Sequence, residues 1–152
     1  MEQSRTFFVT SVCWGRRSVF QVDASVELFL EVLFEQRKQE RAEIHEFVVM
    51  PEHFHALLSP TTKVSLERLM QYIKGGFSFR YGKEKKSKTA VWQQGFTSHH
   101  VRSAADYEKH SEYIRMNPVR RGLVLEPQEF LWSSANPRFK CDAMPPGLKP
   151  II

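Results

Sequence analysis

The sequence contains few cysteines and no long apolar run, and both absences narrow the class of protein. Only two cysteines occur in 152 residues, Cys13 and Cys141, and they form neither a CxxC pair nor a zinc-finger spacing. We therefore expect free thiols in a reducing compartment. No stretch reaches the roughly 18 consecutive apolar residues that a membrane span needs. Charged residues interrupt the first 17 positions, so we expect no secretory leader and a cytoplasmic protein.

The chain also lacks internal repeats, and its composition is that of an ordinary globular domain. Its hydrophobic share is 41% and its charged share 26%, and a length of 152 residues suits one domain with its own core. We place that domain at 1–134. Five of the eight prolines follow Glu126 and apolar periodicity is lost, so residues 135–152 are expected to form an irregular or mobile Pro-rich tail.

Positive charge is scarce in the first part of the chain and abundant in the rest. Residues 1–60 carry 6 Lys/Arg against 9 Asp/Glu, a net charge of −3, whereas residues 61–152 carry 16 against 8, a net charge of +8. Such asymmetry indicates an anionic partner, and nucleic acid is the commonest one. The alternative is a basic surface that is merely solvated.

Strand and helix patterns alternate along the chain. Stretches rich in Phe, Val and Thr predict strands, and apolar residues three and four positions apart predict helices. The expected order is a strand at 5–13, a helix at 23–41, one or two strands over 43–59, a helix from Thr62 or Ser65, one or two short strands over 91–102, a helix over 103–117 and a last short strand within 119–125. This order favours an α+β ferredoxin-like sandwich, with an antiparallel sheet and helices mainly on one face.

Particular residues set several of the expected boundaries. Asp23 is the predicted N-cap of the first helix. Pro51 divides the region 43–59 if two strands form there, because proline cannot donate to a central ladder. Pro118 is predicted to end the third helix at Asn117. The basic stretch 81–88 has no apolar period and is predicted to be an exposed loop.

The apolar run 48–58 contains two histidines, His53 and His55, on either side of Phe54. In a strand, both imidazoles would project from one face and Phe54 from the other, because strand side chains alternate with a period of two. Two imidazoles aimed the same way suit a divalent metal. The alternative is two half-buried histidines without a ligand.

The apolar positions Tyr107 and Ile114 of the third helix, with Ser111 between them, are predicted to form one face. Tyr113 and Asn117 lie four residues apart, so the helix would carry them one turn apart on the other face. A tyrosine can attack a phosphodiester when its oxygen is positioned in line and a cation absorbs the developing charge. The alternative is that Tyr113 only packs and Asn117 caps the helix.

Four ordered motifs resemble those of the REP-associated tyrosine transposases, single-domain relatives of the small IS200-like insertion-sequence transposases in the HUH superfamily. The motifs are VVMPEHFH at 48–55, VWQQGF at 91–96 followed by His99 and Arg102, EYIRMNPVRRGLV at 112–124 and WSS at 132–134. An HxH pattern alone has low specificity, whereas the ordered set is specific. The resemblance covers about residues 6–134.

The resemblance implies a metal-dependent single-stranded DNA endonuclease and transesterase that acts in DNA transposition and recombination. Tyr113 is the implied nucleophile, which would form a 5′-phosphotyrosine link. His53, His55 and Asn117 are the implied ligands of Mg²⁺ or Mn²⁺. No nucleotide cofactor is implied, because the energy of the broken bond is kept in the tyrosine ester.

The implied partner is a REP-type palindromic DNA hairpin with a flanking single strand. The resemblance also implies a monomer or homodimer that binds this DNA in the bacterial cytoplasm or nucleoid. The expected DNA contacts, each of which also has the simpler interpretation of an ordinary surface base, are Lys74, Arg115, Arg120 and Arg121. Glu52, His99 and Arg102 are expected near the metal ligands, although His99 and Arg102 are equally compatible with structural hydrogen bonds.

The chain departs from the family pattern at Glu52, where many relatives carry Asn or Asp, and at Ser98, where an acidic residue is common. The tail after Ser134 matches no motif, and in relatives such a tail can lie over the active site. Two other functions remain compatible with the sequence. One is a hairpin-binding protein that no longer cuts, and the other is a metallohydrolase that combines the histidines with Glu52 or Asp106.

Overall fold

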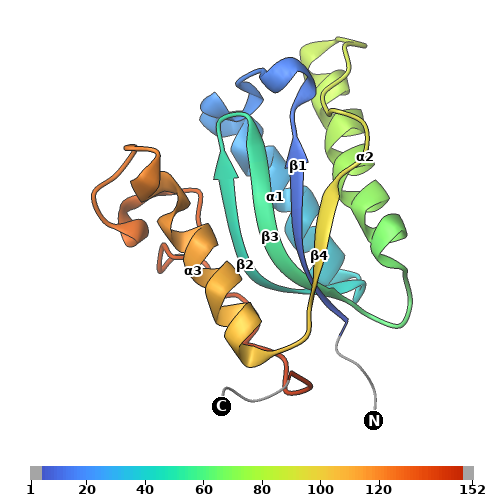
Figure 1. Cartoon of the computed structure of the whole chain (residues 1–152). Coiled ribbons are helices and arrows are strands. Elements are labelled where there is room, and N and C mark those ends of the chain that lie inside the picture. The colour runs from blue at the N-terminus through green and yellow to red at the C-terminus, as the bar shows by residue number, and fades with distance from the viewer. Residues whose placement is uncertain (1–4, 149–152) are drawn as a thin grey trace.

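A computed structural model describes residues 5–148. Strands and helices alternate along the chain (Figure 1). Their bounds are β1 (Thr6–Val12), α1 (Asp23–Lys38), β2 (Ala42–Met50), β3 (His53–Pro60), α2 (Leu66–Lys85), β4 (Thr97–Val101) and α3 (Ala104–Arg120), with short 3₁₀ turns at Trp14–Arg16, Val19–Gln21 and Pro127–Glu129. No helix in the described part of the chain is long and apolar enough to cross a membrane.

The strands form one antiparallel sheet in the order β2-β3-β1-β4. Together with the element order, this arrangement is ferredoxin-like, and the predicted α+β class with an antiparallel sheet is confirmed. Helices α1 and α2 cover one face of the sheet and α3 lies against the other (Figure 1). The strand that begins with His53 therefore lies inside the sheet, between β2 and β1.

The larger core fills the space between the sheet and helices α1 and α2. Phe29 of α1 lies 4.7 Å from Phe54 of β3 and 5.8 Å from Phe77 of α2, measured between ring centroids. All three side chains are fully buried. Burying one such ring stabilises the fold by about 1.5–3 kcal/mol, so this aromatic cluster fixes β3 firmly against both helices.

A smaller core lies between the other face of the sheet and α3. Leu57 and Val101 of the sheet pack there against Tyr107 and Ile114 of α3. The helix face that carries Tyr107 and Ile114, with Ser111 between them, is buried as its sequence spacing predicted. This packing sets the position of α3 along β3, and hence the position of the residues on its neighbouring face.

Helix α2 is longer than the sequence pattern predicted. Ser65 caps it by accepting a hydrogen bond from the Arg68 N–H at 3.0 Å. The helix continues to Lys85, so the prediction of an exposed loop at 81–88 is wrong for most of that stretch. Lysine and glutamate are good helix formers, and lysines in the last turn interact favourably with the helix dipole.

Helix α3 continues through Pro118 to Arg120, so the predicted end at Asn117 is wrong. A proline this close to the C-terminal end removes only one hydrogen bond, and Arg121 closes the next turn by donating to the Asn117 carbonyl at 3.0 Å. Gly122, with a φ of 74°, then reverses the chain. The last strand expected within 119–125 is also wrong, because this described stretch is helix and turn.

Three other boundaries were settled by the structure. The N-cap of α1 is Val22, and Asp23 is the first helical residue, so the predicted N-cap is off by one position. The region 43–59 forms two strands, separated at Pro51 and Glu52. Of the one or two short strands expected over 91–102, one forms, β4.

The C-terminal segment packs along the outer edge of β2. Ser134 donates its N–H to the Phe47 carbonyl at 2.9 Å, and Asp142 donates its N–H to the Ile44 carbonyl at 2.8 Å. The Asp142 carboxylate in turn accepts the Ile44 N–H at 2.8 Å. The described tail is irregular, as predicted, but these bonds fix it to the sheet. Residues 149–152 lie outside the described residues.

Candidate active site

His53 and His55 both project from β3 towards α3. They are 7% and 6% exposed, respectively. Phe54 projects to the opposite face, where it packs 4.7 Å from Phe29. The predicted alternation of this strand is therefore confirmed, and the two imidazoles stand on a rigid element whose other face is anchored in the larger core.

Hydrogen bonds fix both imidazole rings through their Nδ1 atoms. The Nδ1 atom of His53 lies 2.9 Å from Glu52 Oε1, and the Nδ1 atom of His55 lies 2.7 Å from Thr10 Oγ1. The two Nε2 atoms then face each other at 3.1 Å. Both free ring nitrogens thus converge on one point between β3 and α3.

The proton positions on these rings follow from the partners. An ionised carboxylate can only accept, so Glu52 places the proton of a neutral His53 on Nδ1 and leaves a lone pair on Nε2. The Thr10 hydroxyl can donate or accept. His55 can therefore offer a proton to His53 when no ion is bound, or a second lone pair to a cation.

Burial keeps the rings uncharged. Desolvation lowers the pKa of His53, and the Glu52 carboxylate only partly opposes this effect. Burial and the charge of His53 lower the pKa of His55 to about 3. Burial raises the pKa of Glu52, but hydrogen bonds from Arg121 and His53 outweigh it, so the pKa lies below its usual value. Neutral imidazoles beside an ionised carboxylate are the form that binds a metal.

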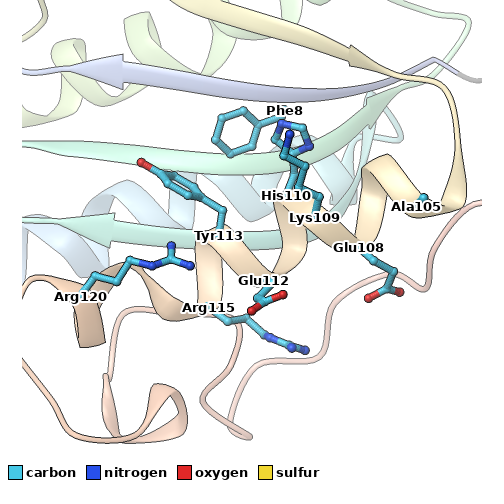
Figure 2. Close-up of a pocket in the computed structure, with 9 residues that line it drawn as sticks. All are labelled: Phe8, Ala105, Glu108, Lys109, His110, Glu112, Tyr113, Arg115 and Arg120. Atoms are coloured by element: carbon cyan, nitrogen blue, oxygen red, sulfur yellow. The ribbon is translucent and has the colours of Figure 1, made fainter.

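Tyr113 lies against this pair from α3. Its ring centroid is 5.3 Å from that of His55 and 5.9 Å from that of Phe8. The side chain is 42% exposed, so a large substrate can reach it. The Arg120 guanidinium lies 5.5 Å from the Tyr113 ring centroid and brings positive charge beside it. In Figure 2, Phe8, His110 and Tyr113 gather between α3 and the sheet.

Asn117 has a buried polar atom that a packing role does not explain. Its residue is 7% exposed, and its Oδ1 atom is buried without a hydrogen-bond partner. Tyr113 and Arg121 lie one turn to either side on the same face of the helix, and they contact His55 and Glu52. Asn117 therefore lies between these two contacts on the same side of the helix, and its unpaired acceptor is suited to a cation.

The residues expected near the metal ligands divide into two groups. Glu52 contacts His53 directly and also accepts a hydrogen bond from Arg121 at 3.0 Å. His99 bonds instead to Asp106, with 2.6 Å between Nε2 and Oδ2. Arg102 donates to His100 at 3.1 Å. The structure thus brings Glu52 to the histidine pair and gives the other two different partners.

The four basic residues expected to contact DNA also lie in different settings. Arg120 and Arg115 line a hollow of about 570 Å³ beside Tyr113. Arg121 is paired with Glu52. Lys74 lies across the sheet on α2, where it donates to the carbonyls of Gln93 and Gly95, and burial lowers its pKa.

Sequence reasoning missed Phe8 and Thr10, the β1 residues that contact His55. Phe8 stacks on the His55 ring at 5.3 Å, and Thr10 bonds to its Nδ1 atom. Alternation along β1 places the two on one face, which was a usable signal. The pairing of Thr10 with His55 depends on the register between β1 and β3, and the sequence does not display that register.

Comparisons with known proteins find related sequences and solved structures of the same fold. The sequence model of the family described as "Transposase IS200 like" matches residues 5–117. The chain is 27% identical over 130 residues to a REP-associated tyrosine transposase of Escherichia coli strain K12, an alignment that covers 85% of this chain and 75% of the relative.

Two solved structures share the fold. One, described as a REP-associated tyrosine transposase bound to a REP hairpin, superposes with a TM-score of 0.74 at 24% identity and covers 97% of this chain and 90% of that one. A candidate transposase from Deinococcus radiodurans superposes with a TM-score of 0.57 at 18% identity, covering 75% and 91% of the two chains.

Proposed function

The chain belongs to the IS200-like transposase family, and from that premise we propose that it cuts and rejoins single-stranded DNA at REP-type hairpins with Tyr113 as the nucleophile. One observation carries the proposal. The exposed Tyr113 lies against His55, beside the converging nitrogens of His53 and His55 and one helical turn from the unpaired Oδ1 of Asn117. The proposed nucleophile and the proposed neutral metal ligands thus come from two elements that are distant in the sequence.

The residues fit a divalent cation, Mg²⁺ or Mn²⁺ in our proposal. His53 and His55 would hold it through Nε2 and Asn117 through Oδ1, because these are the buried acceptors that face the site without a fixed protein donor. When bound, the cation would polarise the scissile phosphate and offset its developing charge. Glu52 and Thr10 would hold the two rings in the ligating orientation.

The covalent step uses the Tyr113 hydroxyl. Its oxygen gives up its proton to solvent and forms a bond to the scissile phosphorus as the bond to the 3′-oxygen breaks, and the departing 3′-oxygen takes up a proton from solvent, so that no net proton is consumed. The products are a 5′-phosphotyrosine link and a free 3′-hydroxyl. Attack by another 3′-hydroxyl reverses the step and rejoins the strands, which requires no ATP. Arg120, whose guanidinium lies 5.5 Å from the ring centroid, favours the negative charge on the phenolate and phosphate.

Hairpin DNA is the proposed substrate for two reasons. The solved relative with the higher TM-score was bound to a REP hairpin. In this chain, residues 61–152 carry a net charge of +8, and Arg115 and Arg120 line the hollow next to Tyr113. Phosphate contacts from such residues would position the DNA, while unpaired bases beside the stem would supply sequence recognition.

The test is a search for the covalent intermediate. The protein is incubated with end-labelled hairpin DNA and Mn²⁺, with and without EDTA, and the products are separated on a denaturing gel. We expect a metal-dependent protein–DNA adduct that disappears in Tyr113→Phe. Tyr81→Phe is the matched control, because Tyr81 packs on Phe77 at the far side of the sheet. Cleavage that survives Tyr113→Phe would contradict the mechanism, and hairpin binding without any adduct would support a protein that no longer cuts.

A further inference from the structure

A second group of potential metal ligands lies at the junction of β4 and α3. His99 of β4 and Asp106 and His110 of α3 each offer a ligand atom, and these three atoms lie within 4.8 Å of one another. We propose that they form a separate binding site for a divalent transition ion of the zinc class, distinct from the site formed by His53, His55 and Asn117.

The local structure brings these side chains together by simple means. Asp106 and His110 are four residues apart on α3, so they share one face of the helix. The Ser103 hydroxyl fixes the start of that helix by accepting the Asp106 N–H at 3.1 Å. His99 arrives from the adjacent strand, and its ring stacks on that of His110 with 4.7 Å between centroids.

The distances are close to those that chelation requires. Asp106 Oδ2 lies 2.6 Å from His99 Nε2, and Asp106 Oδ1 lies 3.2 Å from His110 Nδ1. Without an ion, that Nδ1 atom also donates to the Asp106 backbone carbonyl at 2.8 Å. In a tetrahedral zinc site, bonds of about 2.0–2.1 Å place neighbouring ligand atoms roughly 3.3 Å apart. An ion would therefore need small side-chain rotations and would replace the proton that His110 Nδ1 shares with the Asp106 carbonyl. The His99 side chain is 51% exposed, so water can reach the remaining coordination position.

The chemistry of the donors selects the ion. Two imidazoles and one carboxylate suit Zn²⁺, Co²⁺ and Ni²⁺, whereas Mg²⁺ prefers oxygen ligands and retains its own water. The third ligand beside His53 and His55 would be the neutral amide oxygen of Asn117. The third ligand beside His99 and His110 would be the Asp106 carboxylate. The second set therefore adds a charge–charge attraction for the ion that Asn117 does not supply.

Occupancy would link β4 to the helix that carries the proposed nucleophile. His110 packs on Phe8 with 4.7 Å between centroids, and Phe8 contacts the Tyr113 ring edge to face at 5.9 Å. An ion held by His99 and His110 would fasten the first half of α3 to the sheet at this point. We therefore expect the ion to raise thermal stability as well as to bind.

The simpler explanation of the same contacts is a pair of histidine–aspartate ion pairs without a metal. Stoichiometry separates the two. The apo protein is titrated with ZnCl₂ by isothermal calorimetry in four forms: native, His99→Ala, the matched control His100→Ala from the same strand, and a His53→Ala/His55→Ala double variant. Circular dichroism confirms that each form is folded.

We expect two Zn²⁺ per chain in the native protein and in His100→Ala, and one in each of the other forms. The ion remaining in the His53→Ala/His55→Ala variant should raise the melting temperature, and adding His99→Ala to that variant should remove the shift. Binding in His99→Ala equal in number and affinity to native binding would overturn the proposal. Loss of all Zn²⁺ from the His53→Ala/His55→Ala variant would overturn it as well. Since that variant lacks the proposed catalytic ligands, this result does not depend on whether Tyr113 cleaves DNA.

Discussion

The Thr10 hydroxyl lies 2.7 Å from His55 Nδ1 and fixes the orientation of that imidazole. Removing this hydroxyl therefore tests whether the orientation of His55 matters for metal binding. Thr10→Val keeps the shape of the side chain and removes the hydrogen bond. We expect Mn²⁺ affinity, measured by calorimetry, to fall by about 10–100-fold, the usual cost of losing such a partner. Thr97→Val, at the position paired with Thr10 on β4, is the control and should bind normally. Equal affinities in the two variants would contradict this role of Thr10.

The buried His55 predicts a particular dependence of stability on pH. Its folded pKa of about 3 lies below its ordinary value of 6.5, so between these values the unfolded chain binds more protons than the folded chain. The stabilisation is therefore complete above about pH 6.5 and is lost as the pH falls towards 3. From pH 7 to pH 5 this one group should cost at most about 2 kcal/mol.

Urea unfolding of the EDTA-treated protein at pH 7 and pH 5 measures this effect. We expect the native protein to lose more free energy of unfolding between these pH values than His55→Gln, in which the side chain does not titrate. Other groups, including Glu52, titrate in both proteins, so the difference between the two isolates His55. The same loss in both proteins would show that His55 does not titrate as its burial indicates.

At the scale of the elements, the contact between α1 and α2 depends on one of two adjacent glycines. A Cβ added at Gly76 would lie 2.9 Å from Val32 Cγ1, whereas a Cβ at Gly75 meets nothing within 4 Å. Valine is buried there and stiff at χ1, so it cannot move aside easily. Gly76 therefore permits the close approach of the two helices, and Gly75 does not contribute to it.

Alanine substitutions at these two positions should have different effects on stability. Gly75→Ala removes a poor helix former and should stabilise the protein by about 0.5–1 kcal/mol. Gly76→Ala gains the same propensity but overpacks the helix interface, so it should be less stable than Gly75→Ala by about 1–3 kcal/mol. Chemical denaturation of both variants is the measurement, and equal stabilities would show that the interface adjusts without cost.

The elements also show which predictions local sequence supports. The apolar spacing of α3 and the alternation of β3 reflect burial directly, so Tyr107, Ile114 and Phe54 lie where they were predicted. Boundaries were less predictable. Pro118 was expected to end α3, yet a proline in the last turn costs little, and the polar residues after Tyr81 extended α2 because helix propensity persisted where apolar periodicity ended.

The sequence predicted which residue types form the candidate site, but it predicted only part of how those residues contact one another. The His53 and His55 alternation and the spacing of Tyr113 and Asn117 are local patterns that the sequence displays. The pairing of Thr10 with His55 and of Glu52 with Arg121 depends on strand register and on how α3 packs across the sheet. Those are properties of the whole molecule, and no local pattern contains them.

At the scale of the whole molecule, the C-terminal segment covers the β2 edge of the sheet. Backbone groups of Ile44 and Phe47 on β2 are paired with Asp142 and Ser134. Phe139 adds an apolar contact, 5.0 Å from the Phe47 ring centroid. An uncovered edge strand presents unpaired N–H and C=O groups that another chain can pair with. The tail therefore has a protective role along β2, separate from any effect on catalysis.

Truncation after Ser134 should therefore lower stability and promote association. Phe139 is partly buried, so loss of its packing alone should cost less than the roughly 1.5–3 kcal/mol of a fully buried ring, measured by urea denaturation. The newly exposed groups of β2 should also make the truncated protein associate with rising concentration in sedimentation experiments. Truncation after Ala143, which keeps both Phe139 and Asp142, is the control and should remain close to the full chain in both assays. If the protein truncated after Ser134 is as stable as the control and remains monomeric to the same extent, the contacts between the tail and β2 do not stabilise the fold or prevent association.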